Sequence, residues 1–498
     1  MRLMGGLVWL FSQHAWAGPM DVTGFGGRSI GWAGGGLAQE DGVAAVFANP
    51  AAMQWMDNSE VLFGYAAIRT EFAELPSVWW DTNQDGLIDD TDETLVVQPD
   101  YGRADGFMIG LGRPIGNRFA LGAAMFVPAD QFLRITTFEP ALPTYFMYEN
   151  RLNRYQLMLG FAWEQLPGIS VGGAIEVLAQ ANYSVTLTLD ASISGATNET
   201  EETADLVNDL SMDIHGMTLE LVPSYVPVAA IAWDVGETLP ALEGLRLGST
   251  FRGGAGLPVE VEVDLQGNLT IEQIGDLGPY VVSAVAPLGL NFLEHCQPER
   301  WAAGVGWEHQ DRFSIHADGF FTRWDKMELN VATVVDSTIS TQLIELTDQP
   351  VSDANDMNVE LRSTWSGRLG GEYRFPSWTP QPRENREWDD EFGNLVLAVR
   401  SGVGLEPTPL VRQGTSTTLL DADRILLAGG LGVSHGDPFG VVEGPVQWDI
   451  FMAYQFLATG SLDLGTVPQY RAGAPAGGED IPIGGHLWAA GLQWSFHY

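Results

Sequence analysis

Oxygen-bearing side chains recur at the spacing of a calcium loop near the start of the chain. The segment reads Asp81-Thr-Asn-Gln-Asp-Gly-Leu-Ile-Asp-Asp-Thr-Asp92, with glycine at the sixth position and an apolar residue at the eighth. A twelve-residue calcium loop has this spacing, because Ca²⁺ binds side-chain oxygens and one backbone carbonyl. We expect a structural Ca²⁺ here; the alternative is an acidic, solvated loop. The expected ligands are Asp81, Asn83, Asp85, Leu87 through its carbonyl, Asp89 and Asp92.

A second polar pair has the residue types of acid–base catalysis. His316 and Asp318 are two positions apart and would share one face of a strand. Polar residues that line a barrel lumen have this pattern routinely. The neighbours His295 and Cys296 are adjacent in sequence, so their side chains need not meet. We therefore expect no enzymatic activity and no required cofactor.

The segments that would position these groups alternate between apolar and small or polar residues, with the period of a strand. The same alternation occurs at 155–163, 301–307, 313–321 and 446–456. A β-sandwich would also alternate, but apolar outer faces with aromatic ends favour an all-β, antiparallel transmembrane β-barrel. In the closing strand the apolar face carries Trp488, Ala490, Leu492, Trp494, Phe496 and Tyr498.

The N-terminus has the features of an export signal. A positive start at Met1-Arg2 precedes an apolar stretch and the small-x-small site Ala15-Trp-Ala17, so we expect residues 1–17 to be a signal peptide. No run of about 18 apolar residues follows, which excludes a transmembrane helix. A membrane protein without such helices must be a closed barrel. We expect residues 59–498 to form that barrel in a bacterial outer membrane.

The charge balance is strongly acidic. The chain has 64 acidic and 24 basic residues, a net charge of −40, which argues against a nucleic-acid partner. Cys296 is the only cysteine, so a disulfide framework is excluded. Long polar stretches alternate with short turns, as extracellular loops alternate with periplasmic turns. The expected outer loops are 75–104, which holds the calcium motif, 190–216, 333–357, 376–392 and 460–483.

Residues 18–58 differ from the rest of the chain. They are rich in glycine and alanine, without sustained alternation, and so many glycines do not favour a stable strand. No βαβ pattern follows that would support a nucleotide-binding loop. A small-residue segment ahead of a barrel fits inside its lumen, so we predict that residues 18–58 form a hatch.

Several blocks of sequence resemble those of the FadL/TodX family, outer-membrane transporters of long-chain fatty acids and aromatic hydrocarbons. The run 33–53 closes on Asn49-Pro50-Ala51, and later blocks at 247–252, 298–307 and 401–424 follow in the family's order. The resemblance implies a barrel of about 14 strands, plugged by a hatch, that takes up hydrophobic compounds passively. It also implies sideways release into the membrane through a gap in the wall. Pro128 would mark that gap, since proline removes a ladder hydrogen bond.

The resemblance suggests roles for individual residues. Alternation turns Phe320, Phe451 and Met158 inward, which favours an apolar lumen over a general porin. A fatty-acid carboxylate would need a basic partner, whereas a neutral hydrocarbon would not. The expected hatch or gating residues are Gly24, Phe25, Asn49, Pro50 and Ala51, and the expected ligand-binding residues are Phe320, Met158, Arg154, Arg323 and Lys326.

Other partners follow from the location. The barrel would contact outer-membrane lipid and lipopolysaccharide, and Tyr498 would dock the outer-membrane insertion machinery. The competing function is a surface adhesion barrel whose acidic loops are stiffened by calcium. The hatch discriminates between the two, because an adhesin has no use for a plug.

Overall fold

The computed structural model describes residues 19–75, 104–129, 155–193, 207–271, 280–326, 360–377, 395–411, 419–436, 445–462 and 481–498. Short pieces at 78–80, 93–95, 143–145, 147–148, 333–337, 340–341 and 476–477 are described as well. The predicted signal peptide, residues 1–17, and the predicted calcium ligands, residues 81–92, lie outside the described residues.

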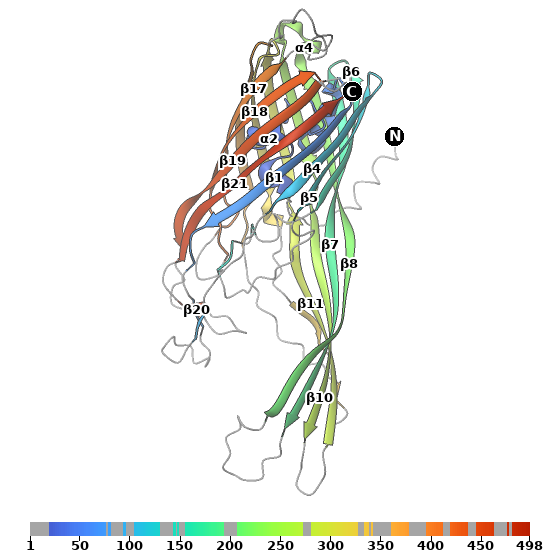
Figure 1. Cartoon of the computed structure of the whole chain (residues 1–498), viewed down its shortest axis with the longest axis vertical. Helices are drawn as coiled ribbons and strands as arrows, with labels where there is room; N and C mark the ends of the chain where they lie inside the picture. The colour runs from blue at the N-terminus through green and yellow to red at the C-terminus, as the bar shows by residue number, and fades with distance from the viewer. Residues whose placement is uncertain are drawn as a thin grey trace, which may run out of the picture.

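Fourteen strands of the described chain form a closed antiparallel barrel, which confirms the predicted fold class (Figure 1). The last strand pairs with the first, from Glu60↔His497 to Phe72↔Gly485. In ladder order the strands are β1 (Glu60–Phe72), β4 (Gly106–Ile115), β5 (Phe119–Pro128), β6 (Gln156–Leu166), β7 (Ile169–Ile193), β8 (Val207–Asp234), β9 (Leu245–Arg252), β12 (Glu299–His309), β13 (Phe313–Arg323), β16 (Thr364–Arg374), β17 (Val396–Glu406), β18 (Arg424–Gly436), β19 (Pro445–Leu462) and β21 (Ile481–His497).

The alternation in the sequence becomes two faces of the wall. In β17 every second residue is buried in the lumen, while Leu397, Val399 and Val403 are exposed on the outside. The same holds in β21, where Leu492 and Phe496 point outward. An apolar outer band of this kind suits contact with lipid, because only apolar side chains are stable against hydrocarbon.

One end of the barrel carries the short turns and the other carries the long connections. The turns after β4, β6 and β12 lie at the upper end in Figure 1, together with α4 (Val235–Thr238) and the C-terminus. The connection that includes 376–392 also leaves from this end, because Arg374 of β16 pairs with Ala398 of β17. It was predicted as an outer loop. That prediction is wrong, since polarity marks a loop but strand parity decides at which end the loop emerges.

The other four predicted loops are partly strand. β7 and β8 stay paired as far as Ile193↔Val207, well into the stretch 190–216 that was predicted to be a loop. Two further strands, β10 (Ala255–Ile271) and β11 (Tyr280–Gln297), extend this ribbon, with β10 parallel to the end of β7. The four strands project from the long-loop end in Figure 1. Within 333–357, β14 (Thr333–Ser337) and β15 (Ser340–Thr341) pair with β11.

A small three-stranded sheet lies apart from the barrel wall. It consists of β2 (Val78–Trp80), β3 (Glu93–Leu95) and β20 (Ala476–Gly477). The sheet therefore joins the connection after β1 to the connection after β19.

Residues 19–56, here called the N-terminal segment, lie inside the barrel. They form α1 (Pro19–Thr23), α2 (Gly27–Gly31), α3 (Ala45–Ala48) and the 3₁₀ helix η1 (Pro50–Trp55). η1 contacts β4 to β8 and α2 contacts β17 to β21, so the segment touches opposite walls. None of the helices in the part of the chain that the structure describes has the length and apolar character needed to cross a membrane.

Candidate functional site in the lumen

The wall and the N-terminal segment fit together through glycines on the inner face. A Cβ at Gly402 would lie 2.7 Å from the Cα of Trp32, and a Cβ at Gly172 would lie 2.7 Å from the Cα of Ala51. Both distances are below any normal carbon–carbon contact, so only glycine permits this approach. The inner-face glycines therefore make room for the backbone of the segment.

The Asn-Pro-Ala motif has a local structural role. The side chain of Asn49 accepts a hydrogen bond from the backbone N–H of Ala51 at 3.2 Å and donates one to the carbonyl of Leu37 at 2.9 Å. Asn49 thus caps η1, and Pro50 occupies its first turn, where no backbone N–H is needed. The other two predicted gating residues lie at the first bend: Gly24 has a φ of +94° and Phe25 is buried.

The inner faces of β12, β13 and β16 to β19 carry many buried charged side chains, together with apolar ones such as Phe451, and we call them the polar wall. Arg28 of the segment lies 3.5 Å from Glu372, which also pairs with Arg400, and Arg400 pairs with Asp449. The backbone N–H of Gly36 donates to Asp318 at 2.7 Å. Charge-assisted bonds of this kind in a buried setting are strong and directional, so they fix the segment in one orientation.

The segment also contributes a buried carboxyl group to this side. Burial raises the pKa of Glu40 from 4.5 to about 7, with Arg28 opposing the shift. Its Oε2 has no hydrogen-bond partner. Burial disfavours the charged form of a carboxyl group, so Glu40 stabilises the docked segment best when it is protonated.

The inner faces of β1, β4, β5 and β6 are mainly apolar instead, with Glu60 and Gln156 as buried polar exceptions, and we call them the apolar wall. Their buried residues include Leu62, Met108, Phe126 and Met158, which belong to one cluster with apolar residues of the segment such as Val46. The cluster continues at the long-loop end, where the ring of Phe72 stacks on Tyr145 at 4.2 Å between centroids. A continuous apolar lining thus runs along one side of the lumen.

The strand ladders are short along the apolar wall. β1 pairs with β4 only from Glu60↔Gly112 to Ala66↔Gly106, whereas on its other side it pairs with β21 as far as Phe72. Beyond Ala66, the contacts between β1 and the start of β4 include an ion pair of Arg69 with Asp105. β5 ends at Pro128, which has no N–H to donate.

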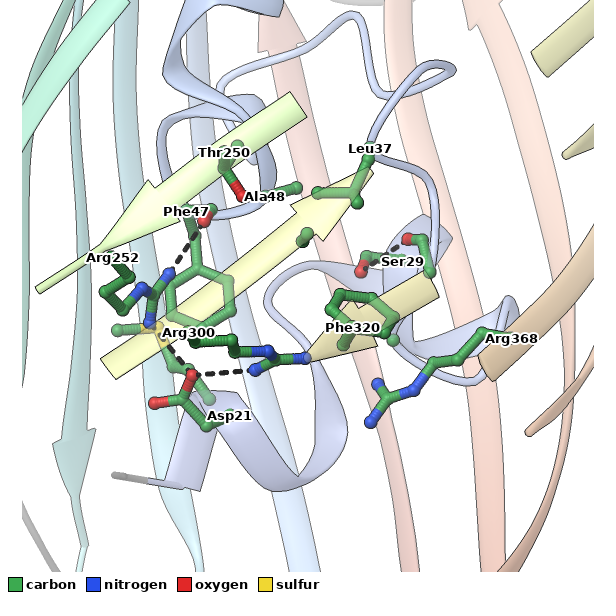
Figure 2. A pocket seen from close by; sticks show the side chains of 14 residues that line it. Asp21, Ser29, Leu37, Phe47, Ala48, Thr250, Arg252, Arg300, Phe320 and Arg368 are labelled. Carbon is green, nitrogen blue, oxygen red and sulfur yellow. Dashed lines mark hydrogen bonds and ion pairs between the residues drawn. The ribbon is translucent and has the colours of Figure 1, made fainter. Parts of the chain in front are cut away.

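A cavity of about 40 Å³ lies between the segment and the wall (Figure 2). Figure 2 shows that Asp21 of α1 faces two arginines, with Arg252 at 2.9 Å and Arg300 at 3.4 Å. The guanidinium carbons of Arg300 and Arg368 lie 4.2 and 5.1 Å from the ring centroid of Phe320. The cavity also has an apolar part, formed by Met20, Leu37, Phe47 and Ala302.

The structure separates the predicted ligand-binding residues. Phe320 lines the cavity and Met158 lies in the apolar wall, both buried as expected. Arg323 and Lys326 do not line the cavity; each pairs with Glu299, at 3.6 and 3.8 Å. Arg154 lies outside the described residues.

The cavity arginines were missed from sequence, although alternation offered a signal. Arg300 precedes Trp301, whose aromatic side chain was expected to face outward, so the period of two already turned Arg300 inward. The same argument applies to Arg252 beside Phe251. Neither position could be related to Arg368 without the strand register.

His316 and Asp318 serve to hold the segment. Their side chains are 3.7 Å apart and buried, with the ring of Trp32 set edgewise on His316 at 4.8 Å. Among the described residues, no group of three or more histidine, cysteine or acidic side chains is placed to hold a metal ion.

Comparison with known proteins identifies the family. The sequence profile described as outer membrane protein transport protein (OMPP1/FadL/TodX) matches residues 8–380, well over half of the chain. The chain belongs to the FadL/TodX family. It is accordingly an outer-membrane transport protein and not an enzyme.

Comparison with solved structures finds similar chains at low sequence identity, and the first of them shares the fold. A FadL homologue from Pseudomonas aeruginosa is 16% identical with a TM-score of 0.52, over 97% of this chain and 99% of the other. The toluene transporter TodX of Pseudomonas putida is 11% identical with a TM-score of 0.46, over 96% and 99%. The monoaromatic hydrocarbon channel CymD is 14% identical with a TM-score of 0.48, over 96% and 98%. No curated protein sequence matches the chain.

Proposed function

We propose that this protein is a passive uptake channel for hydrophobic compounds, such as long-chain fatty acids or hydrocarbons, and that it releases them sideways into the membrane. The observation that carries the proposal is the continuous apolar lining of β1, β4, β5 and β6. Moving hydrocarbon out of water is favourable by about 0.8 kcal/mol per methylene group, so such a lining supplies the driving force for entry without an energy source.

The short ladders support an exit through the apolar wall. The pairing of β1 with β4 stops at Ala66, and β5 ends at Pro128, next to the apolar lining. A solute that left here would pass from lumen to lipid without contact with water. In the proposal, the lateral opening lies in the part of the wall formed by β1, β4 and β5, near Pro128.

The hatch must move for the route to open. Residues 18–58 fill this role in the proposal, and the apolar contacts of the segment would separate first. A ligand replaces such contacts with equivalent ones, whereas the ion pairs of Arg28 have no substitute in a hydrocarbon. Gly24, Phe25 and the Asn49-Pro50-Ala51 cap would set the bends about which the segment shifts.

Reconstitution into lipid vesicles tests the function. Vesicles that contain the barrel should take up hexadecane and hexadecanoate faster than protein-free vesicles, and sucrose at the same rate as protein-free vesicles. Rapid sucrose or ion flux would mean that the barrel is a general pore. Failure to accelerate either hydrophobic solute would refute the proposal.

The remaining roles are proposed on the same footing. The exposed apolar band would contact outer-membrane lipid and lipopolysaccharide, and Tyr498 at the end of β21 would dock the insertion machinery. The loop 81–92 would bind Ca²⁺ and stiffen the connection between β1 and β4. An adhesion role is not favoured, because the buried N-terminal segment suits a gated lumen.

A further inference from the structure

A short part of the connection between β5 and β6 packs against the inner side of the barrel at its long-loop end. It consists of residues 143–145 and 147–148, and we call it the outer strap. Three of its side chains are at most 1% exposed, those of Tyr145, Met147 and Tyr148. All three belong to the apolar cluster that also contains Met20 of the N-terminal segment. The strap and the segment therefore pack against the same apolar lining from two different parts of the chain.

Tyr145 ties the strap to β1 and β21. Its hydroxyl donates a hydrogen bond to the carbonyl of Gly484 at 3.1 Å and accepts one from the N–H of the same residue at 3.0 Å. Gly484 has a φ of +145° and lies where the ladder between β19 and β21 shifts register. The hydroxyl thus supplies a partner for a backbone group at an irregular place in the wall. The ring of Tyr145 also stacks on Phe72 of β1, at 4.2 Å between centroids.

Other contacts tie the strap to the start of β18. The N–H of Leu420 donates to the carbonyl of Thr144 at 2.7 Å. Arg424 donates to the hydroxyl of Tyr148 at 3.1 Å and pairs with Glu406 at 3.1 Å. In the ladder, β19, β21, β1 and β4 lie between β18 and β5. The strap therefore crosses the inner side of these strands, where the apolar lining reaches the long-loop end.

We propose that the outer strap is a second gate, which closes the long-loop end of the apolar lining, and that Tyr145 is its latch. A solute reaches the lining only after the strap leaves Phe72 and Gly484. A hydrophobic solute replaces the ring contact with Phe72, and the two hydrogen bonds to Gly484 hold the strap closed again once the solute has passed. The inference rests on the proposed function, since it names how entry into the channel is controlled.

The two gates differ in the strength of their ties. The bonds of the strap to Gly484 and Leu420 join neutral groups, and only its bond to Arg424 is charge-assisted. The N-terminal segment is held by a buried ion pair of Arg28 with Glu372, and charge-assisted bonds are the stronger kind. We therefore expect the strap to open first and the segment to shift only after a solute has entered.

A reversible disulfide tests the gate. Thr144 and Leu419 form an isolated β-bridge, and bridged residues have Cα atoms about 5 Å apart, within the range of a disulfide. Thr144→Cys with Leu419→Cys is made in a Cys296→Ser background and reconstituted into vesicles. The oxidised protein should take up hexadecane no faster than protein-free vesicles, and reduction should restore uptake. Oxidised and reduced samples come from one preparation, so differences in folding cancel.

A second isolated bridge provides the matched control. Leu361 and Leu410 join the chain before β16 to the chain after β17, without the strap. Leu361→Cys with Leu410→Cys should take up hexadecane equally when oxidised and reduced, with both disulfides verified by mass spectrometry. Equal uptake by the oxidised and reduced strap variant would overturn the inference and leave the proposed function intact. If the wild type itself takes up no hexadecane, the proposed function is at fault.

Thiol labelling tests the latch separately from transport. The thiol introduced by Thr144→Cys occupies a site that is 6% exposed in the closed strap, so a water-soluble maleimide should label it slowly. Addition of Tyr145→Phe keeps the ring on Phe72 but removes the hydroxyl, and should accelerate labelling severalfold. Hexadecane should accelerate it when Tyr145 is present. Tyr155→Phe, at a tyrosine that bonds Met125 instead, is the control and should not change the rate; labelling that neither Tyr145→Phe nor hexadecane accelerates would exclude the latch.

Discussion

The two walls of the lumen hold the same N-terminal segment by different means. The polar wall binds it through buried ion pairs and backbone hydrogen bonds, such as those of Arg28 with Glu372 and Gly36 with Asp318. The apolar wall binds it mainly through dispersion contacts around Leu62, Met108 and Val46, and only secondarily through backbone hydrogen bonds to Glu60 and Gln156. A hydrophobic solute competes with the second kind of contact only. In the proposed mechanism, this asymmetry would let one face of the segment separate from the wall while the other face stays bound.

The largest expected effect comes from breaking the polar wall. Arg400→Gln leaves Asp449 without the arginine it pairs with, while Glu372 keeps Arg28 and Arg374, and loss of one partner of a buried pair costs about 3–5 kcal/mol. We expect the free energy of unfolding in detergent to fall by this amount. Guanidinium unfolding followed by tryptophan fluorescence measures it, with Arg118→Gln as the control; equal midpoints for the two variants would contradict the assignment.

The next largest effect is on the pH dependence of the free energy of unfolding, and it tests the role of Glu40. Burial raises its pKa in the folded protein from 4.5 to about 7. Its contribution to stability is fully present below pH 4.5 and is lost as pH rises through 7, a change on the order of 3 kcal/mol. Glu40→Gln should therefore gain stability relative to wild type between pH 5 and pH 8.

The pH dependence of that difference is the measurement, since it cancels all other titrating groups. Unfolding free energies of wild type and Glu40→Gln should be compared at closely spaced pH values across this range. A difference that does not change with pH would show that Glu40 titrates normally in the folded protein.

A matched pair of substitutions tests the two walls directly. Ala124→Phe on β5 fills the apolar wall, and Ala398→Phe on β17 fills the polar wall, at two buried alanines. A phenyl ring in the apolar wall obstructs the proposed path, so we expect about tenfold slower hexadecane uptake per folded barrel for Ala124→Phe, which corresponds to a barrier higher by about 1.4 kcal/mol. Ala398→Phe should retain the wild-type rate. Equal slowing by both would remove the distinction between the walls.

The smallest effect concerns the connection that leaves the apolar wall after β1. If residues 81–92 bind Ca²⁺ with millimolar affinity, 10 mM Ca²⁺ should stabilise the protein by about 1 kcal/mol. Differential scanning calorimetry with Ca²⁺ and with Mg²⁺ as the control measures this. Asp81→Asn with Asp85→Asn should remove the response, and an equal response to Mg²⁺ would indicate ordinary charge screening.

The sequence predicts which side of the barrel wall a residue faces better than it predicts which residues of other strands lie beside it. A period of two placed Phe320, Phe451 and Met158 inside, and all three are buried in the lumen, because the pleat alone decides the side. The alternation could not show that Arg252, Arg300 and Arg368 lie together. They belong to β9, β12 and β16, and only the register of these strands and of the intervening β13 aligns them. The same limit explains the wrong prediction for 376–392. Its polarity correctly indicated a connection between strands, but polarity does not show from which end of the barrel the connection leaves.

The closing ladder between β1 and β21 has a consequence for biogenesis. The first and last strands of the barrel seal it, and the segment directly precedes β1 in the chain, so it must be enclosed as the seam forms. A chain that stalls before β21 is complete would leave β1 and β19 as open edges, which favour aggregation. Closure of the barrel therefore depends on one late step, in which β21 pairs with β1 around the N-terminal segment.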